Sequence, residues 1–212
     1  MMRKLGSQVS RRKKRVSLNF TPKPLILITC EGETEEEYFN EIRRKLRLPK
    51  ERVRILSKKQ CSGNDPLTLV RCAKTLNIQQ RKDIGIGYDH VWCVFDCDEH
   101  RTIPAAIDMA RRHDFRIAFS NPCFELWFLI HFRRQTAFIN REQLVRTLKN
   151  EVGFSNYEKG LSGLFSYLEN RLDTAIANAR TQRKHHHESN RDITANPSTN
   201  VDEIIELLLK NI

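Results

Sequence analysis

Four short hydrophobic segments alternate with helical patterns in the first part of the chain, and this alternation limits the folds that it can adopt. The segments are LILIT, VRIL, VWCVF and RIAF, at residues 25–29, 53–56, 91–95 and 116–119. Short runs rich in β-branched residues are typical of buried strands. Strands separated by helices favour a parallel sheet with right-handed crossovers. The sequence therefore predicts an α/β fold with a parallel sheet of about four strands, flanked by helices.

Signals for the start of a helix follow these segments. Thr34 and Glu37 have the spacing of a capping box. Asp65 followed by Pro66 is typical of an N-cap and the first helical residue. A third helix is expected to begin near residues 102–104. Each helix would cross from one strand to the next.

The rest of the chain is predicted to be mainly helical. Residues 124–132 are apolar on nearly every side, which suits a helix buried between the sheet and the next layer. Asn140 and Gln143 have the spacing of a capped helix start. Apolar positions recur at helical spacing in 144–148, 161–176 and 201–209. We expect an α/β core at 25–132 and a helical extension at 133–212 that packs on it.

Neither the histidines nor the cysteines indicate a metal site. His185, His186 and His187 lie in the polar segment 182–196, and they are interpreted either as metal ligands or, in preference, as residues of a surface loop. Adjacent histidines in a strand or loop cannot all reach one ion. The six cysteines have no paired CxxC spacing, so they are interpreted as buried thiols rather than a disulfide framework or a zinc knuckle.

The positive charge of the chain is concentrated near its first residues. The formal net charge is +11, and eight of the 37 Lys and Arg lie in 1–24, which contains no acid and leaves 29 basic against 26 acidic side chains elsewhere. We expect a near-neutral body and a disordered basic arm. The arm would either contact phosphate or only aid solubility. The phosphate contacts would come from Arg11, Arg12, Lys13, Lys14 and Arg15.

The hydrophobic segments are too short for a membrane protein. None of them approaches 18 uninterrupted apolar residues, and no apolar stretch follows the basic arm as it would in a secretory signal. We therefore expect a cytoplasmic protein that has no contact with a membrane.

Acidic residues follow the first and third predicted strands. Glu31 comes directly after LILITC, while Asp96 and Asp98 follow VWCVF. The carboxyl ends of parallel strands line the crevice in which α/β proteins bind ligands, so these carboxylates meet if the two strands are neighbours. Two like charges about 4 Å apart repel by about 4 kcal/mol at an effective dielectric constant of 20. A divalent cation would offset this repulsion, and carboxylate ligands favour Mg²⁺ or Mn²⁺ over Zn²⁺.

Other polar residues near these strand ends have two interpretations each. The glutamates at 35–37 are attributed to the helix dipole and to capping. Glu125 is either a fourth metal ligand or a glutamate stabilised by the dipole of its helix. Ser120 or Asn121 is expected to cap a helix that begins at Pro122, and the free N–H groups there would bind phosphate. Lys159, in a glycine-flanked turn, either reaches a phosphate or is solvated.

Five segments together resemble the RloB family of restriction-locus and phage-defence proteins. They are CEGETEEEYF, VFDCDEH, SNPCFELWFLIHF, YEKG and NPSTNV, which begin at residues 30, 94, 120, 157 and 196. An apolar strand that ends in Glu-Gly, with a later strand that ends in Asp-x-Asp, also resembles the Toprim domain of topoisomerases, primases and some nucleases. The resemblance implies a Toprim-like (Rossmann-like) fold.

The resemblance also implies roles for individual residues. Glu31, Asp96 and Asp98 would form the Toprim acidic triad, in which the two aspartates hold Mg²⁺ and Glu31 is a further ligand or the acid/base group. Family membership implies a function in anti-phage defence, beside an ATPase of the ABC or OLD-like kind that is encoded nearby.

Among phosphoryl-transfer reactions, hydrolysis needs the fewest parts. Strand passage and primer synthesis need further domains, for which this chain offers no room. Hydrolysis needs the acidic triad and a basic approach path. We therefore predict a divalent-metal-dependent nuclease that acts on DNA or RNA, with homo-oligomer formation left open. The alternative is a non-catalytic adaptor that binds nucleic acid or a nucleotide and regulates a partner ATPase.

Overall fold

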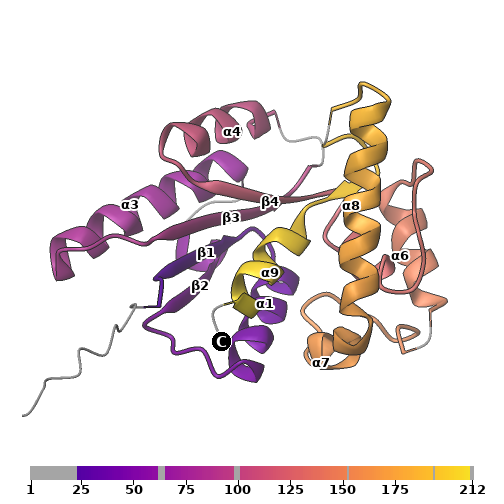
Figure 1. The fold of residues 1–212 in the computed structure, drawn as a ribbon, viewed down its shortest axis with the longest axis horizontal. Helices are drawn as coiled ribbons and strands as arrows, with labels where there is room; N and C mark the ends of the chain where they lie inside the picture. Colours follow the sequence, from indigo (N-terminus) through magenta and orange to yellow (C-terminus); the bar gives the residue numbers. More distant parts are fainter. Residues whose placement is uncertain (1–22, 62–64, 98–100, 152, 193, 211–212) are drawn as a thin grey trace, which may run out of the picture.

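The computed structural model describes residues 23–61, 65–97, 101–151, 153–192 and 194–210. It shows a mixed α/β fold around a five-stranded sheet in the order β2-β1-β3-β4-β5 (Figure 1). The strands are β1 (Ile26–Cys30), β2 (Val53–Ser57), β3 (His90–Asp96), β4 (Arg116–Asn121) and β5 (Ser198–Thr199). The first four are parallel, and β5 pairs with β4 in the antiparallel direction. The predicted four-stranded parallel sheet is confirmed, whereas β5 was not predicted.

Helices cover both faces of this sheet. They are α1 (Glu33–Lys45), α2 (Lys58–Cys61), α3 (Pro66–Ile84), α4 (Ile103–Arg112), α5 (Glu125–Leu129), α6 (Arg141–Lys149), α7 (Leu164–Leu168), the 3-10 helix η1 (Glu169–Arg171), α8 (Leu172–Glu188) and α9 (Val201–Lys210). Helices α3 and α4 pack on one face, and α1, α5, α8 and α9 contribute to the core of the other. Figure 1 shows the long helix α8 standing across the end of the sheet that is nearest to α6.

The alternation of side chains along the strands separates two hydrophobic cores. Ile26 and Ile28 of β1 point toward α1 and the C-terminal helices, while Leu27 points toward α3 and α4. The larger core includes Trp127 and Phe128 of α5, both of which are fully buried. The predicted burial of 124–132 is confirmed for its apolar residues up to Ile130, but the helix ends at Leu129.

The predicted helix starts are correct at two of the four capping sites, Asp65 and Asn140. Asp65 accepts hydrogen bonds from the backbone N–H groups of Leu67 and Thr68 at 3.1 and 3.2 Å, and the capping box at Asn140 is present. The capping box at Thr34 was wrong. The N-cap of α1 is Gly32, two residues before Thr34, and no side chain caps the helix. The Thr34 hydroxyl instead accepts a hydrogen bond from a distant backbone N–H group.

The C-terminal helices differ from their predicted limits. The pattern at 161–176 is divided among α7, η1 and the start of α8. Helix α8 then continues through the histidines, so the surface loop predicted for 182–196 begins only after Glu188. His186 is buried, and its Nε2 lies 2.9 Å from the carbonyl oxygen of Pro197, while His185 and His187 are exposed. A helical turn directs adjacent side chains to different sides.

The interpretation of all six cysteines as thiols was wrong. Cys61, at the end of α2, and Cys72, in α3, form a disulfide that closes a loop with a sequence separation of 11 residues. Cys30, Cys93 and Cys123 are buried free thiols, as predicted, and Cys97 is partly exposed. The disulfide could not be expected from spacing, because it depends on how α2 folds back against α3. Among the described residues, no helix combines the length and apolar character needed to cross a membrane.

Candidate functional site

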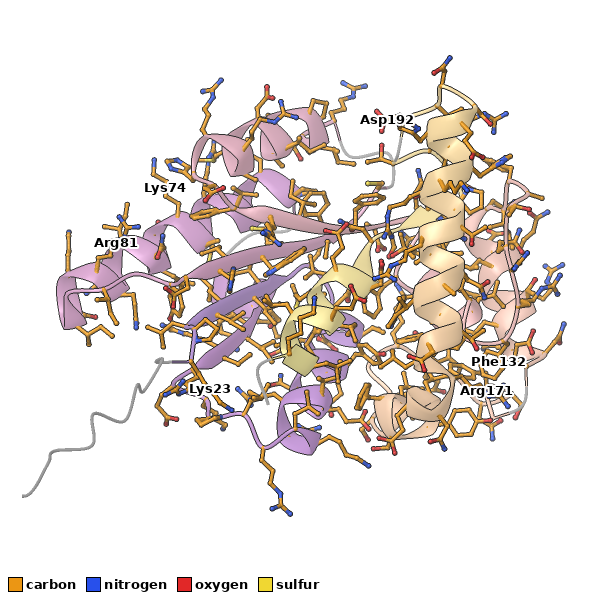
Figure 2. The ribbon with its side chains drawn as sticks, viewed as in Figure 1. Lys23, Lys74, Arg81, Phe132, Arg171 and Asp192 are labelled. Atoms are coloured by element: carbon orange, nitrogen blue, oxygen red, sulfur yellow. A yellow bond between two sulfur atoms is a disulfide. The ribbon has the colours of Figure 1, made fainter. Side chains whose placement is uncertain are left out.

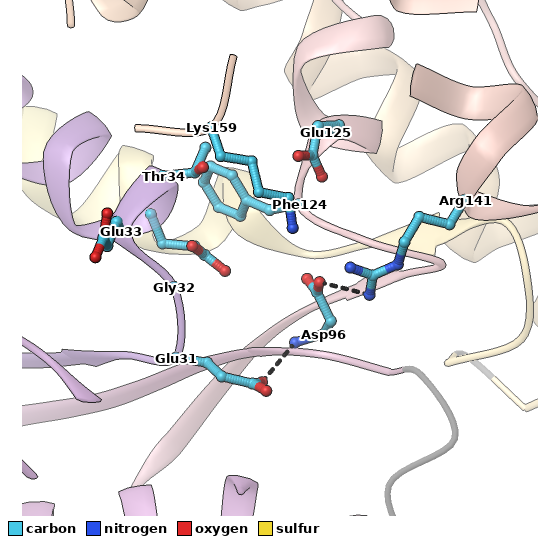
Figure 3. Close-up of a pocket in the computed structure, with 10 residues that line it drawn as sticks. Glu31, Gly32, Glu33, Thr34, Asp96, Phe124, Glu125, Arg141 and Lys159 are labelled. Atoms are coloured by element: carbon cyan, nitrogen blue, oxygen red, sulfur yellow. Dashed lines mark hydrogen bonds and ion pairs between the residues drawn. The ribbon is translucent and has the colours of Figure 1, made fainter. Parts of the chain in front are cut away.

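The carboxyl ends of β1 and β3 lie side by side and open into a cavity of about 300 Å³. We call it the acidic pocket; its lining residues are Glu31, Gly32, Glu33, Thr34, Glu35, Asp96, Phe124, Glu125, Arg141 and Lys159 (Figure 3). The ladder continues past β1, since the Glu31 N–H group donates to the carbonyl oxygen of Val94 at 3.0 Å. The expected meeting of Glu31 and Asp96 therefore occurs.

Asp96 lies between an acid and a base of this pocket. Its Oδ2 accepts a hydrogen bond from Arg141 Nη2 at 3.0 Å, and its backbone N–H group donates to Glu31 Oε2 at 3.3 Å (Figure 3). Its Oδ1 is buried, and no described residue gives it a hydrogen-bond partner. Burial raises the pKa of Asp96 well above its usual range, with a further increase from Glu35, while Arg141 opposes the rise. An unpartnered buried oxygen is costly unless a ligand satisfies it.

Glu35 is a pocket residue that the sequence interpretation missed. Its side chain is 5% exposed, although position 35 is in the first turn of α1 and was attributed to the helix dipole. Burial, with the charges of Glu125 and Glu31, raises the pKa of Glu35 to about 7. A signal was available, because residue 35 is on the same helical face as the buried residues Phe39 and Ile42.

Gly32 makes room for this arrangement. A Cβ atom at position 32 would overlap the Glu35 carboxylate, so any larger residue would displace that carboxylate from its place. The glycine that follows Glu31 therefore does more than permit a turn. It lets a glutamate of the first helical turn fold back over the end of β1.

Glu125 is held in the pocket by a second buried side chain. It is 3% exposed, and its Oε1 accepts a hydrogen bond from the hydroxyl of Tyr157 at 3.0 Å. Burial and the neighbouring Glu125 raise the pKa of Tyr157, so the phenol stays protonated and continues to donate. The carboxylate is therefore oriented by a specific partner and is not a solvated residue at a helix end.

Two basic residues complete the lining. Arg141 is the first residue of α6, and Lys159 extends its ammonium group toward the pocket (Figure 3). The Lys159 segment is fastened to α1, because the Gly160 N–H group donates to Thr34 Oγ1 at 3.1 Å. Helix α1 also holds the residues that follow, through Glu41, whose carboxylate accepts from two backbone N–H groups of α7. Lys159 was predicted as a phosphate contact, whereas Arg141 was missed because it resembled an ordinary first residue of a surface helix.

The helix predicted to begin at Pro122 was wrong. Ser120 and Asn121 belong to β4, a cis peptide precedes Pro122, and α5 begins only at Glu125. The Ser120 hydroxyl lies 2.9 Å from Thr199 Oγ1, and Asn121 Nδ2 donates to the carbonyl oxygen of Thr194 at 2.7 Å. Neither residue lines the acidic pocket. Asp98 and the basic run at 11–15 lie outside the described residues.

The types of ligand atom in the acidic pocket suit a hard divalent cation, but their arrangement does not form a metal site. All of its acidic donors are carboxylate oxygens, the type that Mg²⁺ and Mn²⁺ prefer, and one buried Asp96 oxygen lacks a partner. Within the described part of the chain, however, no three His, Cys, Asp or Glu side chains are arranged to hold a metal ion. Asp96 turns toward Arg141, and Glu31 turns toward a backbone N–H group.

These features define an α/β protein with a polar pocket at the carboxyl ends of neighbouring parallel strands, the usual ligand position in such sheets. The family model for RloB-like proteins matches residues 26–208, and the chain belongs to this family. The resemblance inferred from the sequence is thereby confirmed. Neither the curated proteins nor the solved structures contain a match to this chain.

Proposed function

We propose that this RloB-like protein is a divalent-metal-dependent nuclease with a Toprim-like core, and that it acts in anti-phage defence with a partner ATPase. The observation that carries the proposal is the acidic pocket itself. Glu31, Glu35, Asp96 and Glu125 come from four separate elements or strand ends, yet they share one cavity with Arg141 and Lys159. Buried like charges oppose folding, so such a cluster is expected where a function requires it.

Asp96 is the central ligand in this proposal, since it has the buried oxygen without a partner. Glu31, Glu35 and Glu125 would share the coordination of Mg²⁺ or Mn²⁺, and Asp98 would take part as the second acid of the Asp-x-Asp motif. When bound, the cation would supply charge stabilisation to a phosphodiester and acidify a water molecule.

The chain's own cations would act on the substrate. Lys159, fastened beside α1, would stabilise negative charge on the departing oxygen. Arg141 would orient a non-bridging phosphate oxygen, a role suited to the planar guanidinium group. Tyr157 would keep the Glu125 carboxylate in one orientation. Phe124 would exclude water from one wall of the pocket.

The test is cleavage of a mixed pool of DNA and RNA with Mg²⁺, with Mn²⁺ and with EDTA. The parent protein should cleave only with a divalent metal. Asp96→Asn keeps the shape of the side chain and removes its charge, so the rate should fall by about a thousandfold or more. Glu36→Gln is the matched control, because Glu36 is in the same acidic run but does not line the pocket. Equal rates for Asp96→Asn and the parent would refute the assignment.

One observation favours the non-catalytic adaptor as the second candidate. The Asp96–Arg141 ion pair already offsets the charge of the central carboxylate without a metal ion. An adaptor would bind nucleic acid or a nucleotide without cleaving it and would regulate the ATPase. The same cleavage assay decides, since an adaptor binds the pool and leaves it intact with every metal.

A further inference from the structure

A second cavity, of about 430 Å³, lies between α3 and α4 on the face of the sheet opposite α1. It is lined by residues from the second half of α3, the end of α4 and the turn before β4. We call it the basic groove; its charged lining residues are Lys74, Arg81, Arg111, Arg112 and Asp114. Figure 2 shows Lys74 and Arg81 on α3, away from the end of the sheet covered by α8.

Most of the positive charge in the basic groove is not neutralised. Arg111 lies 3.9 Å from Asp108, an exposed pair of the kind that contributes little. Among the described residues, Lys74, Arg81 and Arg112 make no ion pair. Four basic side chains against one acid give the groove a surplus of three charges, which is as large as that of the whole body outside 1–24. The basic groove therefore carries a net positive charge.

We propose that the basic groove binds the phosphodiester backbone of nucleic acid and holds a long substrate on the molecule. The inference deepens the proposed nuclease function and rests on it. Arginine and lysine side chains around a hollow surface complement the negative charge of successive phosphates. The amide of Asn77 and the ring of His113 add further hydrogen-bond donors at the same surface. Phosphate contacts of this kind position a nucleic acid without reading its sequence.

The distance between the acidic pocket and the basic groove determines how long a nucleic acid must be to contact both. The acidic pocket is at the carboxyl ends of the parallel strands, whereas Arg111 and Arg112 immediately precede the amino end of β4. Strand β3 has seven residues, which span about 23 Å at about 3.3 Å per residue. A duplex covers that distance in about seven base pairs. Longer nucleic acids reach both sites, and a single phosphodiester reaches only one.

The experiment measures binding without catalysis. A labelled DNA duplex of about 20 base pairs and an RNA hairpin are titrated with protein in EDTA, at several salt concentrations, by fluorescence anisotropy. The test variant is Lys74→Gln/Arg81→Gln/Arg112→Gln. The control is Arg146→Gln/Lys149→Gln/Lys210→Gln, which removes the same charge from exposed positions on α6 and α9. The slope of log affinity against log salt should flatten by about 0.9 for each lost duplex phosphate contact, and only in the test variant.

A salt slope that is the same in the test variant, the control and the parent would overturn the groove proposal. Hydrolysis of the small substrate bis(p-nitrophenyl) phosphate with Mg²⁺ is measured in parallel. If the groove proposal holds, its rate is the same in the test variant and the parent, and a lower rate in the test variant counts against it. Failure of the parent to cleave any substrate, combined with a groove-dependent slope, would refute the nuclease proposal and support the groove. If the salt slope changes for only one of the two probes, that probe shows whether the groove binds DNA or RNA.

Discussion

The acidic pocket and the basic groove lie toward opposite ends of the same sheet, and they are built in opposite ways. The pocket gathers side chains from β1, α1, β3, α5, α6 and the segment before α7, spread over more than half of the chain. The groove uses only α3, α4 and the turn that follows α4. Its arginines are exposed, whereas Glu35 and Glu125 are almost completely buried.

This difference determines what each site costs the fold. Solvent screens the charges of the groove, so their mutual repulsion is small. The pocket removes carboxylates from water beside one another, and the raised pKa values of Glu35 and Asp96 reflect a penalty on their charged forms. Removing a pocket carboxylate should therefore lower activity and raise stability, whereas removing groove charges should weaken nucleic-acid binding with little effect on stability. The predictions below test this contrast.

The largest effect is expected for Glu35→Gln. The substitution keeps the size of the side chain and removes one of the pocket carboxylates, so cleavage with saturating Mg²⁺ should fall by about 10²-fold to 10⁴-fold. Initial rates on the substrate found for the parent measure this change. Glu37→Gln, in the same helical turn but outside the pocket, serves as the control and should retain the parent rate. If Glu35→Gln cleaves at the parent rate, Glu35 has no role in cleavage.

The same variant should be more stable than the parent at high pH. Burial raises the pKa of Glu35 from 4.5 to about 7, so the folded state binds this proton more tightly than the unfolded state. The unfolding free energy of the parent therefore falls as pH rises from about 4.5 to 7. In EDTA at pH 8, Glu35→Gln should gain about 1 to 3 kcal/mol, and near pH 4 the gain should disappear. Urea unfolding of both proteins at pH 8 and pH 4 gives these free energies. If the parent is more stable than Glu35→Gln at pH 8, the contrast between pocket and groove is wrong.

The next effect concerns the connection between the two sites. Helix α2 places Lys59 Nζ 2.6 Å from Glu33 Oε1 at the rim of the pocket, and the Cys61–Cys72 disulfide joins α2 to the helix that carries Lys74 and Arg81. Closing a loop of this length stabilises a protein by about 3 kcal/mol in the chain-entropy model. Cys61→Ser/Cys72→Ser should lose about this amount in urea unfolding. Dithiothreitol should destabilise the parent equally and leave the variant unchanged.

The smallest effect is expected for the stability of the groove variant. Lys74→Gln/Arg81→Gln/Arg112→Gln changes side chains that make no ion pair within the described residues, so each change should stay within about 0.5 kcal/mol. Urea unfolding at neutral pH gives the measurement. A loss of several kcal/mol would show that these side chains support the packing of α3 on α4, and that the contrast with the pocket is incorrect.

The sequence was sufficient where structure depends on local patterns. Apolar runs located the four parallel strands, and acids directly after two of them, Glu31 and Asp96, placed the pocket correctly. Residues that act through distant contacts were misread. The local sequence around Ser120 predicts a helix cap, because its actual partner, Thr199, is 79 positions away. Arg141 enters the pocket only because α6 packs next to α5, a tertiary contact that no local spacing reveals.

Glu35 shows a different limit. Its position on the buried face of α1 was readable, but acids in the first turn of a helix have an adequate explanation in the helix dipole. Both the helix dipole and a functional pocket favour a glutamate at this position, so the sequence pattern alone could not distinguish the two explanations. The Cys61–Cys72 pairing was hidden for another reason, because the packing of α2 against α3 determines which thiols meet.

The short strand β5 makes completion of the fold depend on its last elements. Thr199 Oγ1 donates to the carbonyl oxygen of Phe119, and the Asn200 side chain both accepts from Phe119 N and donates to the carbonyl oxygen of Ile117. These contacts span about 80 residues, which is a high contact order. Until residues 198–200 have been synthesised, this edge of β4 lacks the partners that they supply. An incomplete chain of this protein therefore has an unpaired strand edge, which favours aggregation.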